Sequence, residues 1–181
     1  MDEGRAEMDA VLRGWLGFFA LGAGLVHLAL VIGSPLAVGV PLVMVGAAEF
    51  AWGVFAFTRP TVPLPRFARV AALVPILGWV AVLVLGGIGA IGGLRVLPML
   101  VACLLDLAIA IGITWILRRD PARATAPLRP GRYLLSLGAG AIVVAALTTP
   151  ALAATEAGDA ALPHGGDEPY ELILPGGHGS H

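Results

Sequence analysis

The sequence predicts an all-α integral membrane protein with five transmembrane helices, and two observations support this fold class. The first is composition: 58% of the 181 residues are hydrophobic and only 13% are charged, whereas an average soluble protein carries about 25% charged residues. The second is that the apolar residues form five runs long enough to cross a bilayer. A soluble core of this size could not bury so much apolar surface, so we expect the chain to lie in lipid.

Each of the five apolar runs has at least the roughly 20 residues that a helix needs to cross about 30 Å of hydrocarbon. In chain order the runs are Gly14–Ser34, Pro35–Phe57, Val70–Leu94, Val96–Leu117 and Tyr133–Thr155. Each must be helical, because lipid offers no water to backbone groups that lack an internal hydrogen bond. The chain therefore divides into an N-terminal segment (1–13), the five-helix bundle (14–155) and a C-terminal tail (156–181).

Turn and proline signals refine the individual spans. Between the first two runs, Ser34 is a good capping residue and Pro35 suits the first helical position, which predicts a tight antiparallel hairpin. Pro41 in the second run and Pro75 in the third are expected to kink their helices or to shift where they start. Packed membrane helices tolerate such prolines, so all five spans remain predicted.

The arginines predict the orientation, because cytoplasmic connections of membrane proteins are enriched in basic residues. On one side of the spans Arg95 is alone. The other side carries ten arginines: Arg5, Arg13, Arg59, Arg66, Arg69, Arg118, Arg119, Arg123, Arg129 and Arg132. We therefore expect a multi-pass protein of the bacterial cytoplasmic membrane, with a cytoplasmic N-terminus and, after an odd number of spans, an extracytoplasmic tail.

Charge and residue usage exclude several classes of protein. The net charge of −1 is unlike that of a nucleic-acid-binding protein, and we expect no nucleic-acid partner. The single cysteine, Cys103, excludes an intramolecular disulfide framework and a CxxC zinc or redox site. We find no phosphate-binding loop, HExxH or GxSxG motif, and so do not expect an enzyme. Lys, Asn and Gln do not occur, which we interpret as the codon bias of a high-GC bacterium.

Three ionisable residues interrupt the apolar runs: His27 in the first, Glu49 in the second and Asp106 in the fourth. Such side chains are costly inside a bilayer and by default face a partner or a cavity. Counting about 1.5 Å per residue from the arginine-rich side places all three within about 6 Å of one level. The sequence therefore predicts that they meet, with at least one carboxylate in contact with the imidazole.

Three hypotheses compete for this band of ionisable residues. The first is a structural role, in which a histidine–carboxylate hydrogen bond holds helices together. The second is a path for protons or ions, and the third is a transition-metal site. Met44 and Cys103 lie at nearby levels, and Met99 shares a helix face with Cys103 and Asp106. Their sulfur donors together with His27 suit copper(I). The imidazole with the two carboxylates instead suits a harder divalent ion.

The C-terminal tail has an acidic and histidine-containing composition. It carries three of the four histidines, His164, His178 and His181, among acidic residues, Gly and Pro. One interpretation is a solvated acidic tail. The other is metal binding by a short histidine-rich segment, which makes these histidines candidate ligands.

Two functions follow from the sequence as hypotheses. The first is a non-catalytic accessory subunit of a larger bacterial membrane complex, of which an energy-transducing (respiratory) complex is one example; its partners would be lipid and other membrane subunits. The absence of catalytic motifs favours it, and so do glycines that permit close helix packing. These glycines are Gly14, Gly17, Gly86, Gly89, Gly93 and Gly138. The alternative is a protein that binds or transports a transition metal, copper or a divalent ion, through the candidate ligands named above.

Overall fold

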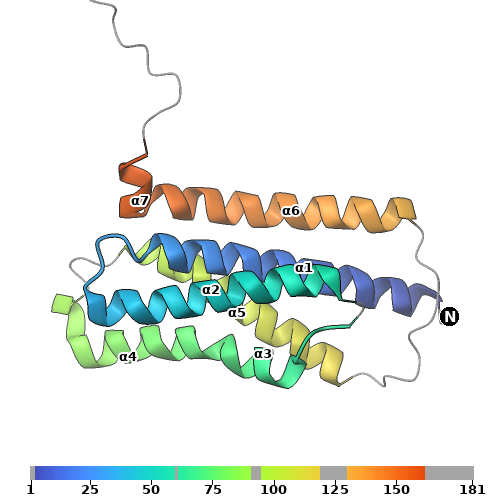
Figure 1. The fold of residues 1–181 in the computed structure, drawn as a ribbon, viewed down its shortest axis with the longest axis horizontal. Helices are drawn as coiled ribbons and strands as arrows, with labels where there is room; N and C mark the ends of the chain where they lie inside the picture. The colour runs from blue at the N-terminus through green and yellow to red at the C-terminus, as the bar shows by residue number, and fades with distance from the viewer. Residues whose placement is uncertain (1–2, 60, 91–94, 119–129, 162–181) are drawn as a thin grey trace, which may run out of the picture.

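A computed structural model describes residues 3–59, 61–90, 95–118 and 130–161, and every regular element in these ranges is a helix (Figure 1). Five helical segments are long and apolar enough to cross a membrane, which confirms the predicted class and number of spans. The helices are α1 (Glu3–Ala29), α2 (Leu36–Thr58), α3 (Pro65–Ala71), α4 (Leu73–Ala90), α5 (Val96–Leu117), α6 (Pro130–Ala153) and α7 (Glu156–Asp159).

The long helices run along one direction, with α6 on one side of the bundle and α3–α4 on the other (Figure 1). Helix α1 packs against α2, α5 and α6, whereas α4 packs against α5. About half of the apolar span is buried in α1 (50%) and α5 (56%), against 22% in each of the other three spans. Helices α1 and α5 are therefore the inner helices, and the others present most of their surface outward.

The outward surface is strongly apolar. Leu36, Val84 and Leu135 are 74% or more exposed, and large hydrophobic side chains are exposed along every span. Patches of this extent are rare on soluble monomers. The surface therefore suits contact with the hydrocarbon of a bilayer.

The turn between α1 and α2 differs from the predicted capping arrangement. Helix α1 ends at Ala29, and Gly33 has a φ of +80°, which glycine adopts without strain. Pro35 is the residue before α2 and not its first helical residue, and it makes no side-chain cap. The Ser34 hydroxyl instead donates a hydrogen bond to the Leu30 carbonyl at 2.6 Å. It therefore satisfies a backbone carbonyl just after the C-terminus of α1. The predicted antiparallel hairpin itself is confirmed.

The third span consists of two helices, α3 and α4, that are broken at Ala72. Pro75 explains the break, because its ring clashes with the carbonyl of the residue four positions earlier and it has no N–H to donate. The prediction that Pro75 kinks or restarts this helix is confirmed. The span begins at Pro65 rather than at the predicted Val70, because Pro65 at the start of α3 needs no hydrogen-bond donor.

The end of the bundle that carries α7 is held together by Arg95. Its guanidinium donates to the Ala154 carbonyl at 2.9 Å and forms an ion pair with Asp159. Thr155 caps α7 by accepting a hydrogen bond from the backbone N–H of Gly158 at 3.2 Å. The first part of the tail is thus anchored to the start of α5, while residues 162–181 lie outside the described residues.

Helices α1 and α2 touch through glycine backbones at two levels. A Cβ built on Gly24 would lie 2.7 Å from the Gly46 carbonyl oxygen, and one on Gly53 would lie 2.9 Å from the Gly17 carbonyl oxygen. The two glycines on each helix are seven residues apart and therefore lie on one face. Small residues of this kind let membrane helices approach until their backbones meet.

We expect Gly46→Ala to lower the free energy of unfolding by about 1–3 kcal/mol, because the added methyl group overpacks the α1–α2 contact. Gly78→Ala in α4 is the matched control, since a Cβ there meets nothing within 4 Å. The control should be neutral or stabilising by up to about 1 kcal/mol, because alanine favours a helix. Unfolding of both variants in one detergent measures the difference, and equal effects would contradict the role of the contact.

Candidate functional site

The α1–α2 contact also positions two of the ionisable residues. His27 follows Gly24 by three positions on α1, and Glu49 follows Gly46 by three positions on α2, so each lies on the glycine face of its helix. Cα–Cβ bonds tilt toward the N-terminus of a helix. Because the two helices are antiparallel, the imidazole and the carboxylate lean toward each other.

His27 and Glu49 form a hydrogen bond inside the bundle. The distance from His27 Nδ1 to Glu49 Oε2 is 2.7 Å, and the exposed fractions of the two side chains are 0% and 12%. The predicted contact between the imidazole and a carboxylate is therefore confirmed. This hydrogen bond joins α1 and α2 beside the contact between Gly24 and Gly46.

Asp106 brings a second carboxylate to the pair from α5. It lies at the middle of that helix and is fully buried. One donor atom from each of His27, Glu49 and Asp106 lies within 4.8 Å of the other two. The predicted meeting of three ionisable residues from three helices is thus confirmed in the structure, and we call these three residues the carboxylate–histidine cluster.

The cluster contains polar atoms that no other described residue satisfies. Within the described ranges, His27 Nε2, Glu49 Oε1 and both carboxylate oxygens of Asp106 are buried and lack a hydrogen-bond partner. A buried polar group without a partner costs about 1–3 kcal/mol, and more if it is charged. Such groups in a native protein are normally explained by a water molecule, an ion or a function.

Apolar side chains surround the cluster on both sides along the bundle. Asp106 lies between two apolar groups on α5, one that contains Leu105 and Ala102 and another that contains Ile109 and Ile113. Water is therefore excluded from most directions, and electrostatic interactions at the cluster are stronger than in water. Charges placed here require a counter-charge or a bound proton.

One cavity reaches the cluster, on the side of Glu49. It has a volume of about 300 Å³ and lies between α2 and the broken α3–α4 span. Its lining is almost wholly apolar and includes Met44, Trp52 and Phe67 beside Glu49. The Trp52 indole is held by a 2.9 Å hydrogen bond to the Pro63 carbonyl, which fixes this wall of the cavity. The cavity accounts for the small exposed fraction of Glu49.

The other candidate ligands predicted from the sequence lie in different surroundings. Met99 is 6% exposed and belongs to the apolar core, and Cys103 packs against that core. The thiol of Cys103 is not among the donor atoms that meet within 4.8 Å. Met44 is 69% exposed and lines the cavity next to Glu49. The tail candidates His164, His178 and His181 lie outside the described residues.

Of the four glycines in the α1–α2 contact, the sequence emphasised one, Gly17. The sequence singled out Gly14, Gly17, Gly86, Gly89, Gly93 and Gly138 as packing glycines. Of these, Gly17 takes part in the α1–α2 contact, whereas a Cβ on Gly138 meets nothing within 4 Å. The signal that would have found the rest is the seven-residue spacing of Gly17 and Gly24 with that of Gly46 and Gly53.

Comparison of the chain with protein-family models, with curated proteins and with solved structures finds no match. The cluster and its surroundings are therefore the features of this protein that point to a function.

We expect a double-mutant cycle of His27→Ala and Glu49→Ala to give a coupling energy of about 1–2 kcal/mol, because the variants remove one interhelical hydrogen bond. Thermal or denaturant unfolding of the four proteins in detergent measures it. The control cycle combines Glu49→Ala with Asp159→Ala at the end of the bundle, where additivity within about 0.5 kcal/mol is expected. A His27–Glu49 coupling no larger than that of the control would show that this contact does not stabilise the bundle.

Proposed function

We propose that the protein binds a divalent transition-metal cation inside the membrane, with His27, Glu49 and Asp106 as ligands. The observation that carries the proposal is the set of buried, unpartnered polar atoms on three side chains whose donor atoms meet within 4.8 Å. A bound cation would satisfy these atoms together. It would also balance two carboxylates in a region where an uncompensated charge is costly.

The arrangement of the three side chains favours metal binding over a purely structural role. A structural hydrogen bond between α1 and α2 needs only His27 and Glu49, and that bond leaves Nε2 of the imidazole and both oxygens of Asp106 unused. A second buried carboxylate, when ionised, weakens a purely structural site, because like charges repel and each loses its hydration. The same carboxylate strengthens a cation site, since two carboxylates balance a divalent ion.

The donor set also favours one class of metal. Imidazole nitrogen and carboxylate oxygen suit Zn²⁺, Mn²⁺, Fe²⁺ or Ni²⁺, whereas copper(I) prefers thiolate and thioether sulfur. Met99 and Cys103 are part of the apolar core or packed against it. We therefore propose a divalent ion and not copper(I), with the cavity beside Glu49 as the route of exchange.

The proposed setting is the bacterial cytoplasmic membrane, with the N-terminus in the cytoplasm and the tail outside. Helix ends that carry Arg59, Arg66, Arg69 and Arg118 gather at the end of the bundle where α1 begins, and Arg95 lies at the opposite end (Figure 1). This asymmetry supports the orientation, because basic residues favour the cytoplasmic side. Binding of a metal cation by the cluster requires no catalysis.

We expect purified protein loaded with Zn²⁺ to retain about one equivalent after removal of free metal, as measured by elemental analysis. His27→Ala, Glu49→Gln and Asp106→Asn should each weaken retention more than tenfold, since loss of a residue that only orients a ligand already costs 10- to 100-fold. Cys103→Ala and Glu156→Gln are controls that should retain the metal. Retention should fall at acidic pH, because protons compete for the same donor atoms.

The tail histidines require a separate control. A variant with His164, His178 and His181 all changed to alanine removes the second set of candidate ligands. Retention of the equivalent by this variant, with its loss in Asp106→Asn, would support the intramembrane site. Loss only in the tail variant would place metal binding in the tail and overturn the proposal for the cluster.

The hypothesis of an accessory subunit of a larger membrane complex, such as a respiratory one, is a second proposal. Broad apolar outer surfaces are compatible with it, but lipid contact explains them equally well. It predicts that tagged full-length protein, extracted in a mild detergent, co-purifies with defined subunits in fixed stoichiometry. Recovery of the protein by itself in every mild detergent would count against it.

A further inference from the structure

A second cavity lies at the arginine-rich end of the bundle, apart from the carboxylate–histidine cluster. It has a volume of about 360 Å³ and lies between α5 and the α3–α4 span. Arg69 from α3 and Arg118 at the end of α5 both line it. Two helices that are separate in sequence thus bring two guanidinium groups to one hollow.

The two arginines are available to an anion. Among the described residues, neither guanidinium of this pair has an ion pair or side-chain hydrogen bond to a carboxylate. Guanidinium groups match phosphate oxygens with paired N–H donors. The carbonyl end of α5 opposes an anion with roughly half a negative charge, and the two full positive charges outweigh it.

The rest of the lining of this cavity is mostly apolar, as expected for a site that faces the membrane. Besides the arginines, the cavity is lined by Thr114 and by four apolar residues, Leu73, Ala110, Ile111 and Trp115. Ile111 and Trp115 are 61% and 42% exposed. Tryptophan is enriched where hydrocarbon meets headgroups. A ligand here would place its charge at the arginines and an apolar part against Leu73 and Ile111, where the cavity opens to the outside.

We propose that this cavity binds one anionic glycerophospholipid, with its phosphate between Arg69 and Arg118 and its acyl chains along the exposed faces of α4 and α5. The charge complementarity selects an anionic headgroup, and the apolar walls select a lipid over free phosphate. Basic pockets between transmembrane helices bind anionic headgroups in this way. The proposal is independent of any metal at the cluster.

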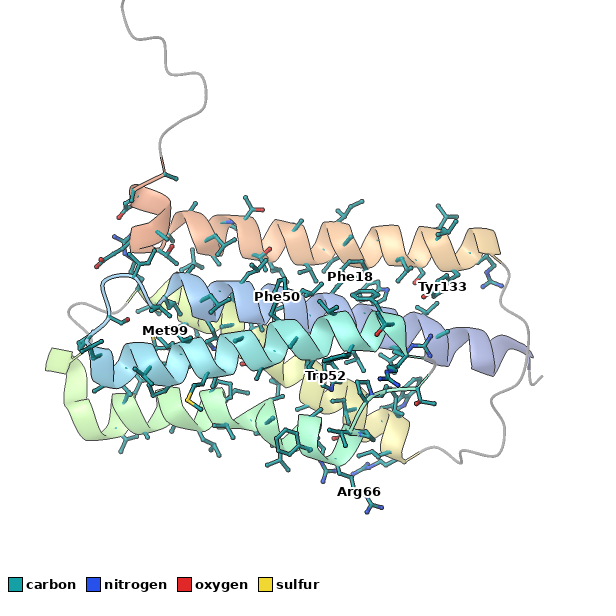
Figure 2. The ribbon with its side chains drawn as sticks, in the orientation of Figure 1. Phe18, Phe50, Trp52, Arg66, Met99 and Tyr133 are labelled. Carbon is teal, nitrogen blue, oxygen red and sulfur yellow. The ribbon has the colours of Figure 1, made fainter. Side chains whose placement is uncertain are left out.

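The test uses full-length protein in phosphatidylcholine nanodiscs, titrated with phosphatidylglycerol and followed by native mass spectrometry after release. One phosphatidylglycerol should be retained in preference to phosphatidylcholine. Arg69→Gln with Arg118→Gln should weaken its binding about 25-fold, about fivefold for each arginine. The matched control is Arg59→Gln with Arg66→Gln, which removes the same charge at the same end. Both control arginines are exposed, and Arg66 projects outward from α3 (Figure 2).

Three results would overturn the proposal. Equal loss in the two double variants would indicate diffuse attraction to basic charge. Displacement of the lipid by millimolar inorganic phosphate would indicate an ordinary phosphate site. Equal retention of phosphatidylglycerol and phosphatidylcholine by the unmodified protein would exclude a selective site, and this comparison decides the question even where a variant fails to fold.

Discussion

The contact between the backbones of α1 and α2 is the constraint on which the rest of the structure depends. Gly24 and Gly46 meet at one level and Gly17 and Gly53 at another, and any larger side chain would force the helices apart. Because α1 also packs against α5 and α6, this contact joins α2 to the rest of the bundle. The 2.7 Å hydrogen bond of His27 depends on the same approach.

The carboxylate–histidine cluster and the apolar packing around it have opposite energetic roles. Burial of carboxylates with unpartnered oxygens opposes folding. The two apolar groups that flank Asp106 and the glycine contact supply packing that does not involve the cluster. The bundle can therefore hold ionisable groups in place without relying on them for its fold, which is the condition under which a membrane protein can dedicate such groups to a ligand.

The two ends of the bundle differ in chemistry. At one end, Arg95 is engaged by Asp159 and the Ala154 carbonyl, so this single arginine ties α5 to α6 and α7. At the other end, Arg69 and Arg118 line a cavity instead of pairing with a described carboxylate. Arg95 therefore stabilises the fold, whereas Arg69 and Arg118 line a surface cavity. The arginines at the two ends of the bundle thus differ in their structural roles as well as in number.

The sequence by itself determined the fold class, the five spans and the ionisable residues that meet, because hydrophobic length and the cost of charge in lipid are local properties. The bounds of α5 were predicted to the residue, and the common level of His27, Glu49 and Asp106 followed from counting along helices. Only the tertiary structure decided which glycines touch, that Met99 is buried in the apolar core with Cys103 packed against it, and that a cavity reaches Glu49. These depend on how each helix is rotated about its axis, which packing sets and a nearly uniform apolar surface does not encode.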